Sequence, residues 1–301
     1  MTGAIGGNTA LTSLSINATT GDIALSLPQI GDGTSAGAGS ASGAVAIGNT
    51  GSGDITFATT NAAGDGAISY LFAGDTTFKS GGDAAGDKAF QVAGDTTIKN
   101  TASTKSITFH TGTIELDADE DLTIETTNGA ISLKNVVGTN GGNGSDLVVN
   151  AGTSTTSLST ISTNINDLTV SGTGVITLTG DITTADYTSG GSEDVGAQSY
   201  SGAVVLSGAD RTVTANTGAI TFSSTINSEA SAARALSIVG IDGAVTVSGA
   251  IGTGTNGILG ALDINTAEAA GNTGTISLAA IGTDSAAGAA SITVGNSRTA
   301  T

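Results

Sequence analysis

Short runs in which apolar and polar residues alternate recur along the whole chain. A period of two places successive side chains on opposite faces of a strand, so each run predicts a β-strand with one buried and one solvated face. Gly, Asp or Asn bounds most runs, and these residues favour turns. The clearest runs are 54–57, 67–70, 106–109, 113–116, 122–124, 130–133, 204–206, 219–222, 236–238 and 244–247. No stretch of similar length has helical periodicity, so the pattern predicts an all-β fold.

Two nearly identical segments lie 20 residues apart: AGDTTFKS at 73–80 and AGDTTIKN at 93–100. This distance is too long for a hairpin and contains no crossover helix, but one coil of a β-solenoid would fit it. On this interpretation Phe78 lies over Ile98 in an internal column, and Lys79 lies over Lys99. Asp75 and Asp95 are expected to hold turns through bonds to their own backbone rather than to bind metal.

Successive strands are spaced so that a coil of roughly 20–25 residues would contain two or three of them, which gives roughly 12–15 coils. The Gly/Ser-rich stretches are interpreted as loops within one solenoid that spans 1–301. The residues expected to point inward are Ile55, Phe57, Ile68, Phe78, Ile98, Ile107, Phe109, Ile131, Leu133, Ile220, Phe222, Val245 and Val247.

A longer internal match relates the two ends of the sequence. Residues 2–57 repeat the phase of 248–301. Matched residues are Leu14 with Leu262, Ile16 with Ile264, Ile23 with Ile276, Leu25 with Leu278, and Ile47 with Val294. We interpret the chain as an excerpt from a longer tandem array. Neither end has a capping helix or a charge cluster, so the partners expected at both ends are neighbouring repeats or copies of the chain itself.

Composition narrows the classes of partner. The chain carries 26 acidic and 8 basic residues, a net charge of −18, which argues against binding to nucleic acid. No apolar run is long enough to insert into a membrane, and the first residues carry no signal peptide. The absence of Cys excludes disulfides and thiolate chemistry.

Several segments resemble the repeats of large filamentous-haemagglutinin-like bacterial surface proteins and giant repetitive adhesins. The residues that carry this resemblance are Gln198, Tyr200, Gly202, Val204, Leu206, Gly218, Ile220, Phe222, Leu236, Ile238, Val245, Val247, Gly249, Ile251 and Gly252. The resemblance implies export to the bacterial cell surface and a role as a stalk or fibre. With the repeats, it leads us to expect one right-handed parallel β-helix (β-solenoid).

The highest density of acidic residues lies at 115–125, and it suggests two possible functions. Alternation would place Glu115, Asp117 and Asp119 on one side of a strand, where paired carboxylates could act on a polysaccharide. Asp117, Asp119 and Asp121 could instead supply oxygen ligands to calcium, although the spacing is not that of an EF-hand. We interpret the acidic segment as a solvated face of the solenoid. His110, the single histidine, is expected to be a polar residue at the end of a strand.

The sequence therefore predicts a structural protein without enzymatic activity: an extracellular fibre or stalk segment that acts in adhesion or in a cell-envelope filament. Exposed loops could contact surface glycans or other cells. One alternative is a carbohydrate-active β-helix enzyme, such as a polysaccharide lyase or hydrolase. The other is an ice- or polysaccharide-binding module, since Thr pairs at 59–60, 76–77, 96–97, 126–127 and 183–184 could form ranks on a flat face.

Overall fold

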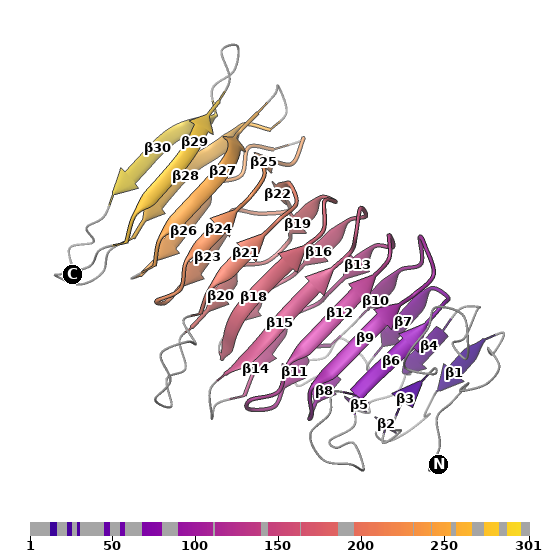
Figure 1. Ribbon diagram of the computed structural model, residues 1–301. Coiled ribbons are helices and arrows are strands. Elements are labelled where there is room, and N and C mark those ends of the chain that lie inside the picture. Colours follow the sequence, from indigo (N-terminus) through magenta and orange to yellow (C-terminus); the bar gives the residue numbers. More distant parts are fainter. Residues whose placement is uncertain are drawn as a thin grey trace. The chain divides into compact units, whose positions relative to one another are not determined.

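The computed structural model has strands and no helices in its described part (Figure 1). The described residues are 13–16, 23–25, 29–30, 45–48, 55–57, 68–79, 90–110, 112–139, 144–162, 164–185, 196–230, 232–241, 243–253, 257–266, 274–282 and 288–295. The chain divides into two compact units, Met1–Gly141 with Ser145–Thr156, and Gly142–Gly144 with Ser157–Thr301. The all-β prediction is confirmed.

In the first unit the chain runs round three parallel ladders in turn, so each coil contributes one strand to each ladder. The first ladder contains β1 (Leu14–Ile16), β4 (Val45–Gly48), β7 (Thr76–Lys79), β10 (Ile107–Phe109) and β13 (Ile131–Ser132). The second contains β2 (Ile23–Leu25), β5 (Ile55–Phe57), β8 (Phe90–Val92), β11 (Ile114–Leu116) and β14 (Val136–Gly138). The third contains β3 (Gln29–Ile30), β6 (Ile68–Phe72), β9 (Thr96–Asn100), β12 (Leu122–Thr126) and β15 (Ser145–Asn150).

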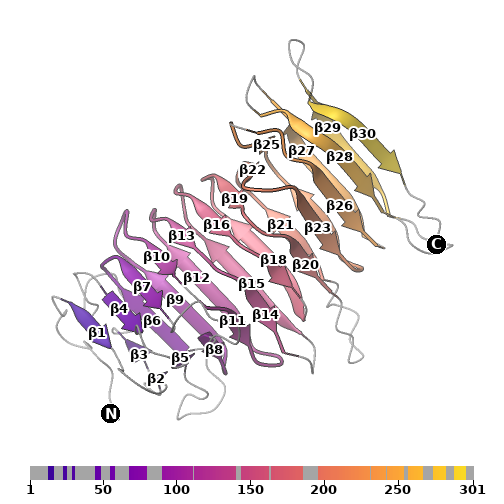
Figure 2. The ribbon, with the colours of Figure 1, turned by 180° about the vertical axis from the view of Figure 1, so that it is seen from behind.

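The second unit repeats this plan. One ladder contains β17 (Ile161–Ser162), β20 (Ile182–Thr184), β23 (Arg211–Ala215), β26 (Leu236–Gly240), β28 (Leu259–Asn265) and β30 (Ala289–Gly295) (Figure 2). The other strands are β18 (Ile165–Ser171), β19 (Ile176–Leu178), β21 (Gln198–Tyr200), β22 (Val204–Leu206), β24 (Ile220–Phe222), β25 (Ile226–Ser228), β27 (Val245–Ile251) and β29 (Ile276–Ile281). β16 (Thr156–Leu158) lies where the units divide the chain.

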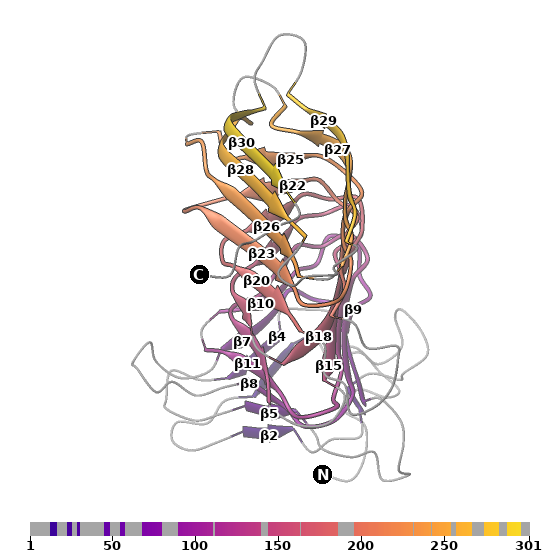
Figure 3. The ribbon, with the colours of Figure 1, turned by 90° about the vertical axis from the view of Figure 1, so that its left-hand side faces the viewer.

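The long strands β27 and β29 each serve two ladders of the second unit. Val245–Val247 pairs with β24, whereas Ile251 pairs with β25, and the register between β27 and β29 shifts between Val247 and Ala250. Figure 3 shows β27 and β29 on one side of this unit and β26, β28 and β30 on the other. Both units are thus parallel β-solenoids with three strands per coil, which confirms the predicted fold class.

Some coils have the expected 20–25 residues, as between Ile114 and Val136, and others are longer. The described residues place five strands in the second ladder of the first unit and six in the corresponding ladder of the second, one for each coil. Strands that pair in register on successive coils lie as little as 21 residues apart, as for Ile161 and Ile182, and as much as 35 apart, as for Ile55 and Phe90. The estimate of roughly 12–15 coils assumed a shorter coil and is too high for the described residues.

The stacking of Phe78 on Ile98 is wrong. Phe78 of β7 lies between Ile47 and Phe109, and Ile98 of β9 lies between Tyr70 and Ile124. The two similar segments are therefore different sides of the solenoid, separated by β8. For the same reason Lys79 does not lie over Lys99. Stacking follows the length of the whole coil, and a local sequence match does not fix that length.

The core consists of inward columns that run from coil to coil. Of the residues expected to point inward, all whose side chains are described are at most 2% exposed: Phe78, Ile98, Ile107, Phe109, Ile131, Leu133, Ile220, Phe222, Val245 and Val247. Ile55, Phe57 and Ile68 have side chains outside the described set. Aromatic rings also stack along the columns, with Phe78 and Phe109 4.8 Å apart between ring centroids.

Glycine before a strand lets neighbouring coils approach closely. A Cβ on Gly243 would lie 1.8 Å from the carbonyl oxygen of Gly218, which precedes the paired strand of the previous coil. A Cβ on Gly129 would lie 1.7 Å from the carbonyl oxygen of Lys105 in the same way. The recurrent unit of Gly, a small residue and then an inward Ile or Val therefore has a steric origin.

Candidate functional site

The polar chemistry of the first unit is organised around Asp residues that precede strands. Asp75 lies immediately before β7, and its Oδ1 accepts hydrogen bonds from the backbone N–H of Ser106 (2.9 Å) and from the Ser106 hydroxyl (3.0 Å). Ser106 precedes β10, the strand that pairs with β7 in the next coil. The Lys105 ammonium lies 2.9 Å from the other carboxylate oxygen. We call such a residue an inter-coil aspartate.

The inter-coil aspartate supplies a hydrogen-bond acceptor at a corner of the coil. The backbone carbonyl of the residue before it already accepts other hydrogen bonds. The carbonyl of Gly74 accepts hydrogen bonds from the hydroxyl of Thr76 and from the Asn100 side-chain amide. Thr76 and Asn100 are both buried, at 1% and 0% exposure. A backbone N–H left unpaired at a corner would be costly, and the carboxylate of Asp75 satisfies it. Asp75 was expected to bond its own turn, but it bonds the next coil instead.

Three aspartates on successive coils repeat this arrangement, and the carboxylates of the first two are the acceptors. Asp95 Oδ1 accepts the N–H of Asp121 at 3.0 Å, and Asp121 Oδ1 accepts the N–H of Asp146 at 2.9 Å. Each precedes the Leu or Thr that pairs in register along β9, β12 and β15. Burial raises the pKa of Asp121, and the negative charges of Asp146, Asp95 and Asp119 raise it further. The pKa of Asp75 is instead lowered, first by the N–H of Ser106 and then by Lys105.

The second unit uses the same device. Asp167, Asp181 and Asp210 accept the backbone N–H groups of Ala197, Thr212 and Ala235 in their next coils. Asn227 does so for Thr253, through its side-chain oxygen. These residues were not identified from the sequence. The signal that could have found them is an Asp directly before the first inward residue of a strand.

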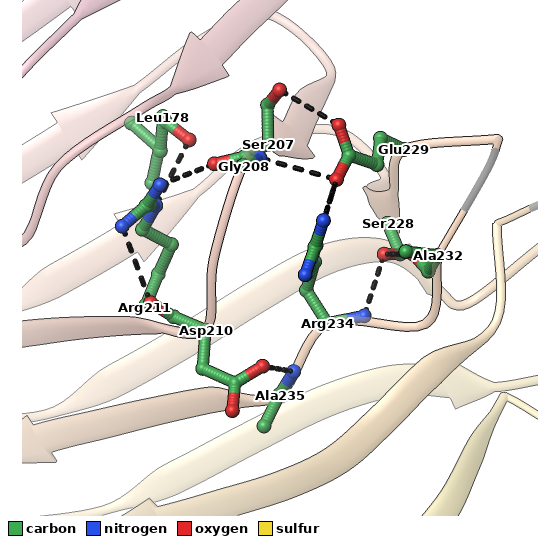
Figure 4. Close-up of polar contacts among 10 residues, drawn as sticks. All are labelled: Leu178, Ser207, Gly208, Asp210, Arg211, Ser228, Glu229, Ala232, Arg234 and Ala235. Carbon is green, nitrogen blue, oxygen red and sulfur yellow. Dashed lines mark hydrogen bonds and ion pairs between the residues drawn. The ribbon is translucent and has the colours of Figure 1, made fainter.

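Glu229 and Arg234 form the centre of a second polar cluster, drawn in Figure 4. Arg234 is ion-paired to Glu229 at 2.6 Å, and the same carboxylate accepts hydrogen bonds from the Ser207 hydroxyl and the N–H of Gly208 in the previous coil. The bond from Arg234, followed by that from Ser207, lowers the pKa of Glu229. Glu229 therefore joins an arginine of its own coil to the backbone of the coil before it.

Arg211 extends this cluster across three coils (Figure 4). Its guanidinium donates hydrogen bonds to the carbonyl oxygens of Leu178, Ser207 and Asp210. The side chain of Asp210 in turn accepts the N–H of Ala235 at 2.8 Å. The planar five-donor guanidinium suits such multiple backbone contacts, and here it ties coils together.

A small open pocket of about 260 Å³ lies on the first unit. Its lining residues are Lys99, Glu125, Thr126, Thr127, Asn150 and Gly152. Lys99 and Glu125 lie opposite each other on β9 and β12 and form an ion pair at 2.6 Å, with side chains 44% and 29% exposed. A half-exposed ion pair between hydroxyl and amide groups could hydrogen-bond a polar ligand such as a sugar.

The acidic segment does not form the face that alternation predicted. Glu115 lies on β11, but Asp117 and Asp119 follow the strand in a turn, where Asp119 takes a left-handed conformation (φ 66°). The placement of Glu115, Asp117 and Asp119 on one side of a strand is therefore wrong, because the strand ends at Leu116. Asp117 accepts a hydrogen bond from Gln91 at 3.3 Å, and Asp121 belongs to the inter-coil aspartates.

The three residues considered as calcium ligands do not form one site. Within the described ranges, the structure gathers no three His, Asp or Glu side chains in a geometry that would hold a metal ion, and Asp117, Asp119 and Asp121 are not brought together as one site. His110 directly follows β10, is exposed, and donates its backbone N–H to Phe78. The expectation of a polar residue at a strand end is confirmed.

One member of each described Thr pair points into the coil. Thr76, Thr96, Thr126 and Thr184 are at most 5% exposed. Each donates its hydroxyl to a nearby glycine carbonyl. In each of these pairs one Thr therefore points inward, and only the other can face solvent. The pair at 59–60 lies outside the described residues.

Comparison with known proteins adds no assignment. No family model matches the chain, and neither a curated protein nor a solved structure is significantly similar to it. The part of the chain that the structure describes also contains no helix with the length and hydrophobicity needed to cross a membrane.

Proposed function

We propose that this chain is a structural segment of an extracellular fibre or stalk on a bacterial cell surface, and that it acts mechanically rather than as an enzyme. The observation that supports this most is the repeated use of charged side chains to join coils. Asp75, Asp95 and Asp121 in one unit, and Asp167 and Asp210 in the other, all bond the backbone of the following coil.

Such bonds suit a protein that must keep its coils stacked under load. At these positions of the described part, one coil is held to the next by ladder hydrogen bonds, by inward apolar columns and by a side-chain bond at a corner. The resemblance to filamentous-haemagglutinin-like repeats supports the location outside the cell, and the acidic net charge of −18 would keep such a fibre soluble and self-repelling.

The experiment that tests this proposal is surface labelling of the source cells. Antibodies raised against the folded chain should label intact, unpermeabilised cells, with gold particles at a distance from the envelope in electron micrographs. Label that appears only after permeabilisation would contradict the proposal. Incubation of the protein with pectin and alginate should release no new chain ends, and release of such ends would favour a polysaccharide lyase or hydrolase.

Polysaccharide binding is a second candidate, and the pocket at Lys99 and Glu125 favours it. A glycan array with the wild-type chain tests this candidate, with a Glu125→Gln variant to locate the site. Binding that Glu125→Gln reduces would support an adhesive role for the segment. Binding that does not change would place recognition elsewhere on the surface.

A further inference from the structure

The pocket on the first unit is built around one outward column of side chains that crosses three coils. Lys99 of β9, Glu125 of β12 and Asn150 of β15 are in-register neighbours, and all three line the pocket. On the same strands they follow inward residues such as Ile98 and Ile124, which are 0% exposed. The strand ladder therefore sets the spacing of these polar groups, at about 4.8 Å from coil to coil.

Gly152 keeps one end of the pocket open and also orients Asn150. Its φ is 59°, and a Cβ there would lie 2.2 Å from the carbonyl oxygen of Thr127, so a side chain does not fit at this position. The N–H of Gly152 donates to Asn150 Oδ1 at 2.9 Å. Within the described ranges the NH2 group of Asn150 has no acceptor in the protein, so it can donate to a ligand.

The charges of the pocket cancel, which disfavours an anionic ligand. Lys99 Nζ and Glu125 Oε2 lie 2.6 Å apart, and this contact uses one of the three ammonium donors and one of the two carboxylate oxygens. The two side chains are 44% and 29% exposed, so their remaining groups can reach a ligand. A carboxylate or phosphate would meet Glu125 as well as the net charge of −18, whereas a neutral ligand would not be repelled.

Donors on both sides of an acceptor match a pair of adjacent hydroxyl groups. Each hydroxyl can donate one hydrogen and accept at its oxygen. In this column the acceptor of Glu125 lies between the donors of Lys99 and Asn150. A sugar ring holds neighbouring hydroxyls at a fixed separation, so it loses less conformational freedom on binding than a flexible polyol does.

We infer that this pocket binds a neutral sugar residue through two vicinal hydroxyl groups, and that it discriminates against uronates. One hydroxyl donates to the Glu125 carboxylate and accepts from the Lys99 ammonium, and the other accepts from the Asn150 amide. This inference rests on the second candidate function, polysaccharide binding, and names its ligand class. Because the three side chains come from three coils, the site exists only when those coils are stacked.

The test compares three immobilised polysaccharides as probes of the folded chain by surface plasmon resonance. They are galactomannan, which is neutral and carries vicinal hydroxyls, the same polymer after periodate cleavage of those diols and borohydride reduction, and alginate, a uronate polymer. The salt concentration is about 0.15 M, which screens long-range repulsion. The wild-type chain should bind intact galactomannan at least about tenfold more tightly than either of the other two.

Two variants assign this binding to the pocket and separate charge from shape. Lys99→Met should lower the affinity for galactomannan about tenfold without raising that for alginate, because a donor is lost. Glu125→Gln leaves Lys99 as an uncompensated cation, so it should lower the affinity for galactomannan and raise that for alginate. The matched controls Lys134→Met and Glu115→Gln lie outside the pocket lining and should bind as the wild type does. Melting temperatures confirm that all four variants are folded.

Three results would overturn the inference. They are no binding to galactomannan, equal binding to the polymer with cleaved diols, and binding that neither pocket variant changes. Tighter binding to alginate would overturn the ligand class and leave polysaccharide binding in place. None of these results affects antibody labelling of intact cells, so failure of this inference is distinguishable from failure of the proposed role as a surface fibre.

Discussion

The carboxylate of Asp95 accepts a hydrogen bond of 3.0 Å from the backbone N–H of Asp121, in the next coil of the first unit. Asp121 repeats the same bond to Asp146. At both corners a charged side chain thereby takes the place of a backbone carbonyl as the acceptor. The arrangement also stacks like charges, because the acceptor of one coil is next to the acceptor of the following coil. The hydrogen bond should stabilise the fold and the stacked like charges should destabilise it. Substitution of Asp95 can separate the two effects.

Replacement of Asp95 separates the hydrogen bond from the charge. Asp95→Ala leaves the N–H of Asp121 without its side-chain acceptor and should cost roughly 0.5–1.5 kcal/mol of unfolding free energy. Asp95→Asn keeps an acceptor oxygen and removes one like charge, so its stability should equal or exceed that of the wild type. Urea unfolding of the three proteins at pH 7 measures the difference. If Asp95→Asn lost as much stability as Asp95→Ala, the charge rather than the acceptor would matter.

The pH dependence of stability follows from the carboxylates of the same segment. The pKa values of Asp121 and Glu120 are raised, chiefly by burial, so the folded state binds protons more readily than the unfolded state. Stability should therefore rise as the pH falls from 7 towards the ordinary values of 3.8 and 4.5. The pKa of Asp75 is lowered, so its contribution is present above 3.8 and is lost only as the pH falls further.

The measurement is urea unfolding at a series of pH values between 7 and 3. Asp121→Asn retains an oxygen that can accept the N–H of Asp146 and should flatten the rise between pH 7 and 4. Asp75→Asn should leave that rise intact and weaken the loss below pH 3.8. A wild-type stability that fell steadily from pH 7 would show that the raised pKa values have been misassigned.

Close approach of coils makes Gly243 sensitive to a single methyl group. Gly243→Ala would place a Cβ 1.8 Å from the carbonyl oxygen of Gly218, so the coils must separate locally. We expect a loss of about 1–3 kcal/mol, the usual range for overpacking. Gly295→Ala is the matched control, because no atom lies within 4 Å of the added Cβ. Thermal unfolding followed by circular dichroism compares them, and equal melting temperatures would argue against the close contact.

The aromatic column of the second unit offers a direct test of the core. Phe222 is 1% exposed and its ring stacks on that of Tyr200, with centroids 4.7 Å apart. Phe222→Asp would bury a carboxylate without a partner and should cost several kcal/mol, about 3 or more, enough to unfold part of the unit. Thr221→Asp places the same charge on the outward face of β24 and should cost less than about 1 kcal/mol. Comparable melting temperatures for the two variants would refute the assignment of inward residues.

Tyr200 adds a polar element that alternation alone does not predict. Its hydroxyl donates to Gln198 Oε1 at 2.7 Å, and Gln198 donates to the Thr184 hydroxyl and to the carbonyl of Thr214. Burial raises the pKa of Tyr200 well above its ordinary value, so the phenol remains a donor. Gln198 is buried although it is an amide, because its side chain makes all three of these hydrogen bonds to other groups of the protein.

The sequence by itself determined which residues form strands and which of them point inward. Ile220, Phe222, Val245 and Val247 were identified from alternation alone, because burial on a strand has a period of two and depends only on near neighbours. Only the tertiary structure decided which strand lies on which. Phe78 stacks on Phe109 and not on Ile98, because the partner depends on the summed length of three strands and the loops between them. The same dependence hid the role of Asp75 and Asp95, whose hydrogen-bond partners lie a full coil away in the chain.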